Sequence, residues 1–247
     1  MFTPYTSRKV LLIVLLLFCS NWNFAGPPFN TDDPQTVDYK HWEFYVASTN
    51  TYQSKTWTGT SPHFEVNYGL IPNVQIHLLL PINYNYVRNE RPDFGYAYTE
   101  FGVKYRFIQE TTGMPQIGIF PIIEIPTIKN NQFSNGKAQI FIPLWAQKTW
   151  GKLTTYGGGG YWINPGINNK DWIFYGWEIQ YDISPVLTLG GELYYHSANT
   201  IDSESVIGFN LGGYINFTEK FHLLYSIGHS LKSDSFISSY VGLLWTI

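Results

Sequence analysis

The chain has 247 residues and a formal net charge of −3; only 13% of its residues are charged, whereas 18% are aromatic. Soluble domains carry about 25% charged residues, so this composition argues against a protein whose whole surface faces water. The acidic balance argues against a nucleic-acid partner.

The first 25 residues have the pattern of an export signal peptide. Arg8 and Lys9 form a basic region, residues 10–18 are an unbroken apolar stretch, and Ala25 is a small residue at the expected cleavage position. The apolar run is too short to cross a membrane as a helix. Cleavage removes the only cysteine, Cys19, so we expect no thiol or disulfide chemistry in the mature chain. It also leaves 13 of the 15 basic residues against 18 acidic ones, a net charge of −5.

Residues 26–39 precede the first predicted strand and are rich in proline and aspartate. We expect a periplasmic segment or a plug that folds into the interior of the following domain. Asp32 and Asp33 have side chains that could bind a cation, but a turn before Pro34 is the favoured interpretation.

Residues 40–247 show a period of two, the pattern of strands with unlike faces. In VQIHLLLPINYNY, residues 74–86, apolar and aromatic residues occupy the even positions, and Gln75, His77, Asn83 and Asn85 share the odd ones. At about 3.3 Å per residue this run is long enough to cross a bilayer as a tilted strand. The same template predicts twelve strands, near 40–50, 60–69, 74–86, 95–107, 115–126, 137–148, 153–163, 172–182, 186–196, 205–217, 221–230 and 237–247.

The predicted connections alternate between tight turns, such as residues 70–73 and 218–220, and longer polar loops, such as residues 53–58 and 197–203. This alternation and the even strand count are typical of an outer-membrane barrel. We therefore predict an all-β, antiparallel transmembrane barrel of about twelve strands in a Gram-negative-type outer membrane, with both termini in the periplasm.

Charged residues inside each predicted strand occupy alternate positions, and the apolar residues beside them occupy the positions in between. A bilayer excludes charge from the outer face of a barrel, so these residues are predicted to face the lumen. They either form a charge network that fills the interior or a polar constriction that selects solutes. The predicted lumen residues are Glu43, Glu65, Glu100, Lys104, Arg106, Glu124, Glu178 and Glu192. Residues 139–148 are apolar on both parities, so the pattern leaves Lys148 unplaced.

Aromatic residues gather at the ends of the predicted strands, at the alternate positions that the apolar residues also occupy. This is the expected position of an interfacial aromatic girdle. The predicted girdle residues are Tyr68, Tyr105, Phe107, Tyr181, Phe217 and Trp245. The last strand alternates like the terminal strands that the barrel assembly machinery recognises, although it ends in Ile247 rather than an aromatic residue.

Several stretches of the chain also resemble a known family. PPFNTDDPQTV, HWEFY, YGLIPNVQIHLLLPI, FGVKYRF, IPLWAQKTWGKLTTYGGGGYWIN and HLLYSIGHS are similar to the outer-membrane transporter family associated with the MetA pathway of phenol degradation. The resemblance implies an outer-membrane barrel that passes small, often aromatic or hydrophobic, compounds. It brings no set of functional residues with it.

No catalytic or cofactor-binding motif is found. The glycines of YGGGGYW, residues 156–162, lack the lysine of a phosphate loop and are better explained by close backbone approach in the wall. His196 and Ser197 are the one His–Ser pair of interest, but adjacent strand residues point to opposite faces. We predict a passive channel for small molecules, with membrane lipid as its surroundings and no metal or cofactor. A closed structural or adhesion barrel is the first alternative, and a lipid hydrolase is the second.

Overall fold

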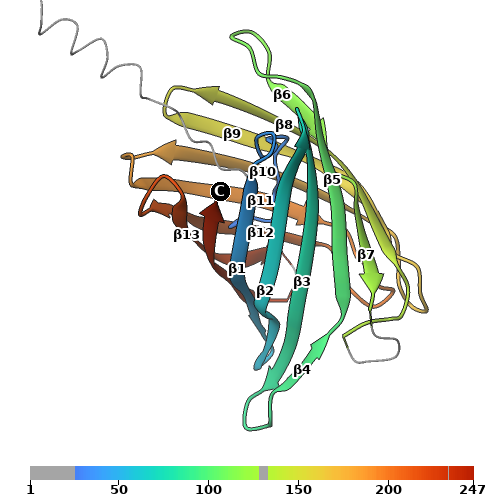
Figure 1. The fold of residues 1–247 in the computed structure, drawn as a ribbon. Helices are drawn as coiled ribbons and strands as arrows, with labels where there is room; N and C mark the ends of the chain where they lie inside the picture. Colours follow the sequence, from blue (N-terminus) through green and yellow to red (C-terminus); the bar gives the residue numbers. More distant parts are fainter. Residues whose placement is uncertain (1–25, 128–132, 233) are drawn as a thin grey trace, which may run out of the picture.

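The computed structural model describes residues 26–127, 133–232 and 234–247, and Figure 1 shows a wall of long antiparallel strands. The predicted export signal at residues 1–25 lies outside the described residues. No helix in the described ranges is long and apolar enough to cross a membrane. The strands are β1 (Trp42–Gln53), β2 (Thr56–Ile71), β3 (Val74–Val87), β4 (Asp93–Tyr96), β5 (Tyr98–Ile108), β6 (Gln116–Ile119), β7 (Ile122–Pro126), β8 (Gln139–Trp150), β9 (Leu153–Ile163), β10 (Trp172–Asp182), β11 (Leu187–His196), β12 (Val206–Asn216), β13 (Phe221–Lys232) and β14 (Phe236–Thr246).

The first and last strands close the sheet into a barrel. β1 pairs antiparallel with β14 from Glu43, opposite Thr246, to Gln53, opposite Phe236. The remaining strands pair antiparallel around the wall. Closure pairs the backbone N–H and C=O groups that a bilayer core could not satisfy.

Two strands of the wall are interrupted. β4 and β5 are separated by Ala97, and both pair with β3. β6 and β7 are separated by Phe120 and Pro121, and both lie between β5 and β8. Pro121 has no N–H to donate to the ladder, which accounts for the second interruption. The fourteen strands of the described residues therefore form a twelve-stranded wall, and the predicted all-β antiparallel barrel is confirmed.

The predicted strand ends are partly right. β9 and β10 have the predicted bounds, residues 153–163 and 172–182. The longer loop predicted at residues 53–58 is wrong, because Ser54 and Lys55 alone connect β1 to β2. Both have positive φ, 50° and 68°, as a tight two-residue hairpin turn requires.

Alternation along each strand separates an inner from an outer face. In β5, Phe101 and Tyr105 are 42% and 45% exposed, whereas Lys104 is 3% exposed. In β10, Trp177 is exposed and the neighbouring Glu178 is completely buried. The outer face is therefore apolar and aromatic at these positions, and charge lies on the inner face.

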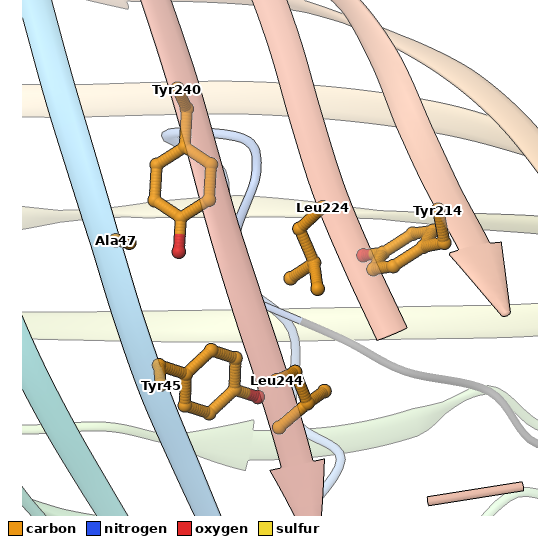
Figure 2. Packing of buried hydrophobic residues seen from close by; sticks show 6 residues of the cluster. All are labelled: Tyr45, Ala47, Tyr214, Leu224, Tyr240 and Leu244. Carbon is orange, nitrogen blue, oxygen red and sulfur yellow. The ribbon is translucent and has the colours of Figure 1, made fainter. Parts of the chain in front are cut away.

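Apolar side chains also occupy part of the inner face. Figure 2 shows six buried residues that meet from four strands on one side of the barrel. The interior is therefore not lined by polar groups alone. The six residues are Tyr45 and Ala47 of β1, Tyr214 of β12, Leu224 of β13, and Tyr240 and Leu244 of β14.

Candidate functional site in the barrel lumen

Residues 26–39 cross the interior of the barrel, as the blue loop that precedes β1 in Figure 1. The backbone N–H groups of Asn30 and Thr31 donate to the Glu192 carboxylate of β11 at 2.7 and 2.8 Å. The Thr31 hydroxyl donates to the same carboxylate at 2.6 Å. Thr31 and Asp33 are completely buried, so the wall of the barrel encloses this part of the segment.

Three further strands hold the same segment through side-chain contacts. Gly176 of β10 leaves room for it, because a Cβ atom at Gly176 would lie 2.0 Å from the Thr31 hydroxyl oxygen. Contacts on several strands fix the segment across the lumen. They are Gln75 Oε1 of β3 accepting from Val37 N at 2.8 Å, Arg106 Nη1 of β5 donating to Gln35 Oε1 at 2.7 Å, and Ser226 Oγ of β13 donating to Pro28 O at 2.6 Å.

Lys104 of β5 links the wall to the two aspartates of the segment. Its ammonium donates to Asp32 Oδ1 at 2.8 Å and lies 3.8 Å from Asp33 Oδ2. It also lies 4.8 Å from the centre of the Phe120 ring, within cation–π range. Burial raises the pKa of Asp33 to about 8; Lys104 opposes this shift, and the neighbouring Asp32 adds to it. One cation therefore faces two carboxyl groups, and Asp33 is the group that favours its protonated form.

A second polar cluster lies on β2, β3 and β5. His77 Nε2 lies 2.9 Å from Glu100 Oε1, and its Nδ1 lies 2.8 Å from Asn67 Oδ1. The Asn67 amide donates to Glu65 Oε1 at 2.8 Å. His77 thus bridges two of the predicted lumen glutamates. The sequence placed His77 on the polar parity of its strand but offered no sign of these partners.

The eight predicted lumen residues differ in how deeply they are buried. Glu65, Glu178, Glu192 and Lys104 are buried, and the other four, Glu43, Glu100, Arg106 and Glu124, are partly exposed. They do not form one network in the described residues. Their role as a network or a constriction stays a prediction.

The basic side chains have partners other than the expected strand glutamates. Lys104 pairs with aspartates of the segment at residues 26–39, and Arg106 donates to the amide oxygens of Asn73, Gln35 and Gln116. Lys148, which the sequence left unplaced, lies 3.2 Å from Glu110 in the loop after β5. Neither carboxylate oxygen of the buried Glu178 has a hydrogen-bond partner among the described residues.

The six predicted girdle residues lie at the end of the barrel where β1 begins and β14 ends. Tyr105, Phe107, Tyr181, Phe217 and Trp245 are each 45–56% exposed, and Tyr68 is half-buried. Tyr68 packs on Trp42, with ring centroids 4.3 Å apart. A girdle at a membrane interface stays a prediction.

An aromatic wall lines the lumen on β8, β9 and β10. Phe141, Trp162 and Trp172 form a stack, with ring centroids 4.8 Å apart at 11° and 5.2 Å apart at 7°. The glycine run of β9 makes room for this wall. A Cβ atom at Gly158 would lie 3.0 Å from the Trp145 ring, and one at Gly160 would lie 2.6 Å from the Phe141 ring. Residues 139–148 are apolar at both odd and even positions because the inner face of this strand is aromatic.

Two of the cavities that border the segment have lining residues in common. The cavity that we call the outer cavity, of about 820 Å³, is lined by the aromatic wall and by Asn199, Asp202, Ser203 and Glu204 of the loop after β11. The inner cavity, of about 480 Å³, is lined by the segment, by Glu43 and Glu65, and by residues near the C-terminus. Asp32 and Phe120 line both cavities. The contact of Lys104 with these two side chains therefore divides the lumen.

The His–Ser pair does not form a catalytic contact. His196 Nδ1 faces the backbone oxygen of Ser197 at 3.0 Å, and the Ser197 hydroxyl oxygen accepts from Ile173 N at 3.0 Å. The imidazole is therefore not positioned to take a proton from this hydroxyl.

Comparison with solved structures identifies the architecture. The chain superposes on the COG4313 outer membrane channel from Pseudomonas putida F1 with a TM-score of 0.71 and 12% identity, over 91% of this chain and all of that one. The likeness is one of fold. Two porins share this fold. The NanC porin superposes with a TM-score of 0.59 and 9% identity, over 82% of this chain and 98% of that one. The KdgM porin superposes with a TM-score of 0.56 and 12% identity, over 81% of this chain and 98% of that one. No protein-family model matches the chain, and no curated protein matches it in sequence.

Proposed function

We propose that this protein is an outer-membrane channel that admits small solutes passively, with residues 26–39 as its plug. The arrangement of the two cavities carries the proposal. They adjoin one another, because Asp32 and Phe120, which Lys104 contacts, border both. Movement of the short segment that contains Asp32 would therefore join them, without any change in the strands of the wall.

The outer face supports a location in the outer membrane. On β14, Val241, Leu243 and Trp245 are 52%, 42% and 53% exposed, a surface suited to lipid rather than water. The fold is shared with a solved outer-membrane channel. We further propose that the termini face the periplasm, because tight turns follow β2, β8 and β12 at that end. β14 would then be the strand that the barrel assembly machinery recognises.

Aromatic and hydrophobic solutes are the class that the resemblance to the MetA-pathway transporters implies. The lining of the outer cavity supports this class, because Trp145, Trp162, Trp172 and Phe174 all border it. Ligand sites are typically apolar cavities of about 300–1,000 Å³ with a few polar groups, and this cavity falls in that range.

A closed structural barrel is the second candidate, favoured by the fixation of the segment on several strands. Solute flux separates the two functions. Proteoliposomes that contain the wild-type protein should swell in glycerol and in tyrosol, and deletion of residues 27–39 should increase the rate severalfold. Heat-modifiable gel mobility checks that the deletion variant still forms a barrel. If a folded deletion variant swells no faster than empty liposomes, the channel function is wrong.

A further inference from the structure

The charged side chains that line the outer cavity all have the same sign. They are Asp32, Asp202, Glu204 and Asp234, and no lysine or arginine is among the described residues that line it. Asp202 and Glu204 are exposed and have no ion-pair partner in the part of the chain that the structure describes. Their negative charge is therefore available to a solute.

The aromatic wall of this cavity is suited to a ring or a branched apolar group. Phe141, Trp162 and Trp172 stack on one another, so both faces of the central Trp162 ring are covered and a solute meets its edge. Ring edges carry partial positive charge and pack well against the face of another ring.

A buried donor gives an independent sign of a ligand. Trp145 borders the outer cavity and is 1% exposed, and its indole N–H has no hydrogen-bond partner among the described residues. A buried N–H without an acceptor is costly, so the site favours a molecule that brings an oxygen or a π face to it.

We propose that the outer cavity binds small arylalkylammonium cations, molecules with an aromatic ring, an oxygen acceptor and a positively charged amine. The ring packs on the aromatic wall, the acceptor meets the Trp145 N–H, and the ammonium lies toward the carboxylates of Asp202 and Glu204. This inference rests on the proposed channel function and adds the charge of its preferred solute.

The inner cavity is compatible with passage of the same cation. Its acidic residues are Asp32, Asp38, Glu43 and Glu65, and its lysines are Lys104 and Lys220. A cation that leaves the outer cavity thus meets further carboxylates in the inner cavity, beyond the contact between Lys104 and Asp32. An anion meets carboxylates in both cavities, and fixed charge along a narrow path selects against it.

Three probes of one skeleton test the charge preference: tyramine, tyrosol and 4-hydroxyphenylacetate, which carry an ammonium, a hydroxyl and a carboxylate. Binding is measured by isothermal titration calorimetry on the full barrel in lipid nanodiscs at low ionic strength, because salt screens exposed carboxylates. We expect tyramine to bind about fivefold more tightly than tyrosol, with 4-hydroxyphenylacetate weakest. Equal or tighter binding of the anion, or no binding of any probe, would overturn the proposal.

Variants assign the preference to residues. Asp202→Asn with Glu204→Gln should abolish the advantage of tyramine over tyrosol. The matched control, Glu90→Gln with Asp93→Asn, should keep it, because Glu90 lies in the turn after β3 and Asp93 begins β4, and neither lines the cavity. Trp145→Phe should weaken tyramine and tyrosol alike by about fivefold. Trp150→Phe, at an exposed position outside the cavity, is its control. Retention of the tyramine advantage in the Asp202/Glu204 variant contradicts the site.

Glycerol swelling separates this inference from the channel function. A protein that passes glycerol but binds the three probes equally retains the channel and loses the charge preference. A protein that binds tyramine selectively but passes no solute, even without residues 27–39, keeps the site and loses the channel.

Discussion

Lys104 of β5 holds Asp32 of the N-terminal segment at 2.8 Å, and this ion pair lies where the two lumen cavities meet. The lysine belongs to the wall, and the aspartate belongs to the segment that crosses the lumen. The free energy of docking of the segment and the continuity of the lumen therefore depend on the same contact.

Replacing Lys104 with Met should release the segment. The change removes the buried ammonium that pairs with Asp32, and loss of one partner of a buried pair costs up to about 3–5 kcal/mol. We expect faster proteolysis within residues 26–39 and faster glycerol swelling. Lys148→Met is the control, because Lys148 pairs with Glu110 and lines neither the inner nor the outer cavity. If K104M and K148M behave alike, Lys104 does not hold the plug.

Glu192 and Glu178 form a second matched pair, because they lie opposite one another in the ladder between β10 and β11. Glu192 accepts three hydrogen bonds from the segment, whereas Glu178 has none among the described residues. Glu192→Gln should weaken docking by about 1–3 kcal/mol, because hydrogen bonds to a charged group are lost or weakened. Glu178→Gln should leave docking unchanged. Proteolysis of the segment measures both, and equal effects would contradict the assigned role of Glu192.

The two faces of the wall were predictable from the sequence, because lipid and lumen impose opposite demands on neighbouring residues. In β5 a period of two was sufficient to place Lys104 inside and Tyr105 outside. The pattern was uninformative in β8, where Phe141 and Trp145 face an aromatic interior while Ile142 and Leu144 face outward. Alternation indicates a face only where the two faces differ in polarity.

The contacts that hold the segment across the lumen could not be predicted in the same way. Thr31 meets Glu192 across 161 positions of sequence, and Lys104 meets Asp32 across 72. Parity places Glu192 inside the barrel, but its partner depends on the path of a segment that has no periodic pattern. The sequence suggested a plug because residues 26–39 are long enough to enter the lumen; the anchoring residues required the structure.

The docking of the segment should weaken as pH rises. Burial raises the pKa of Asp33 from 3.8 to about 8, so between these values the docked state binds more protons than the released state. Release of the segment therefore loses protons, and higher pH favours it. We expect glycerol swelling to be faster at pH 8 than at pH 5, and Asp33→Asn to reduce this difference. Faster swelling at the lower pH would give the opposite sign and contradict the role of Asp33.

Gly158 should be essential for assembly of the wall. Its φ is +153°, and a Cβ atom there would lie 2.0 Å from the backbone oxygen of Leu144. Gly158→Ala should therefore destabilise the barrel by about 3 kcal/mol or more. Gly113→Ala is the control, because nothing lies within 4 Å of its Cβ position. Heat-modifiable gel mobility compares the folded fractions, and a fully folded G158A barrel would show that β8 and β9 need no such close approach.

A disulfide between Thr31 and Gly176 should lock the plug in place. A Cβ atom at Gly176 would lie 3.0 Å from Thr31 Cβ, about 0.5 Å short of the range found in disulfides, so a small shift allows the bond. The sole native cysteine lies in the predicted export signal, so the engineered pair has no competing thiol in the mature chain. Thr31→Cys with Gly176→Cys should swell slowly in glycerol when oxidised and faster after reduction, whereas each single variant should not respond to reductant. If the oxidised, cross-linked barrel swells as fast as the reduced one, the solute path does not require movement of this segment.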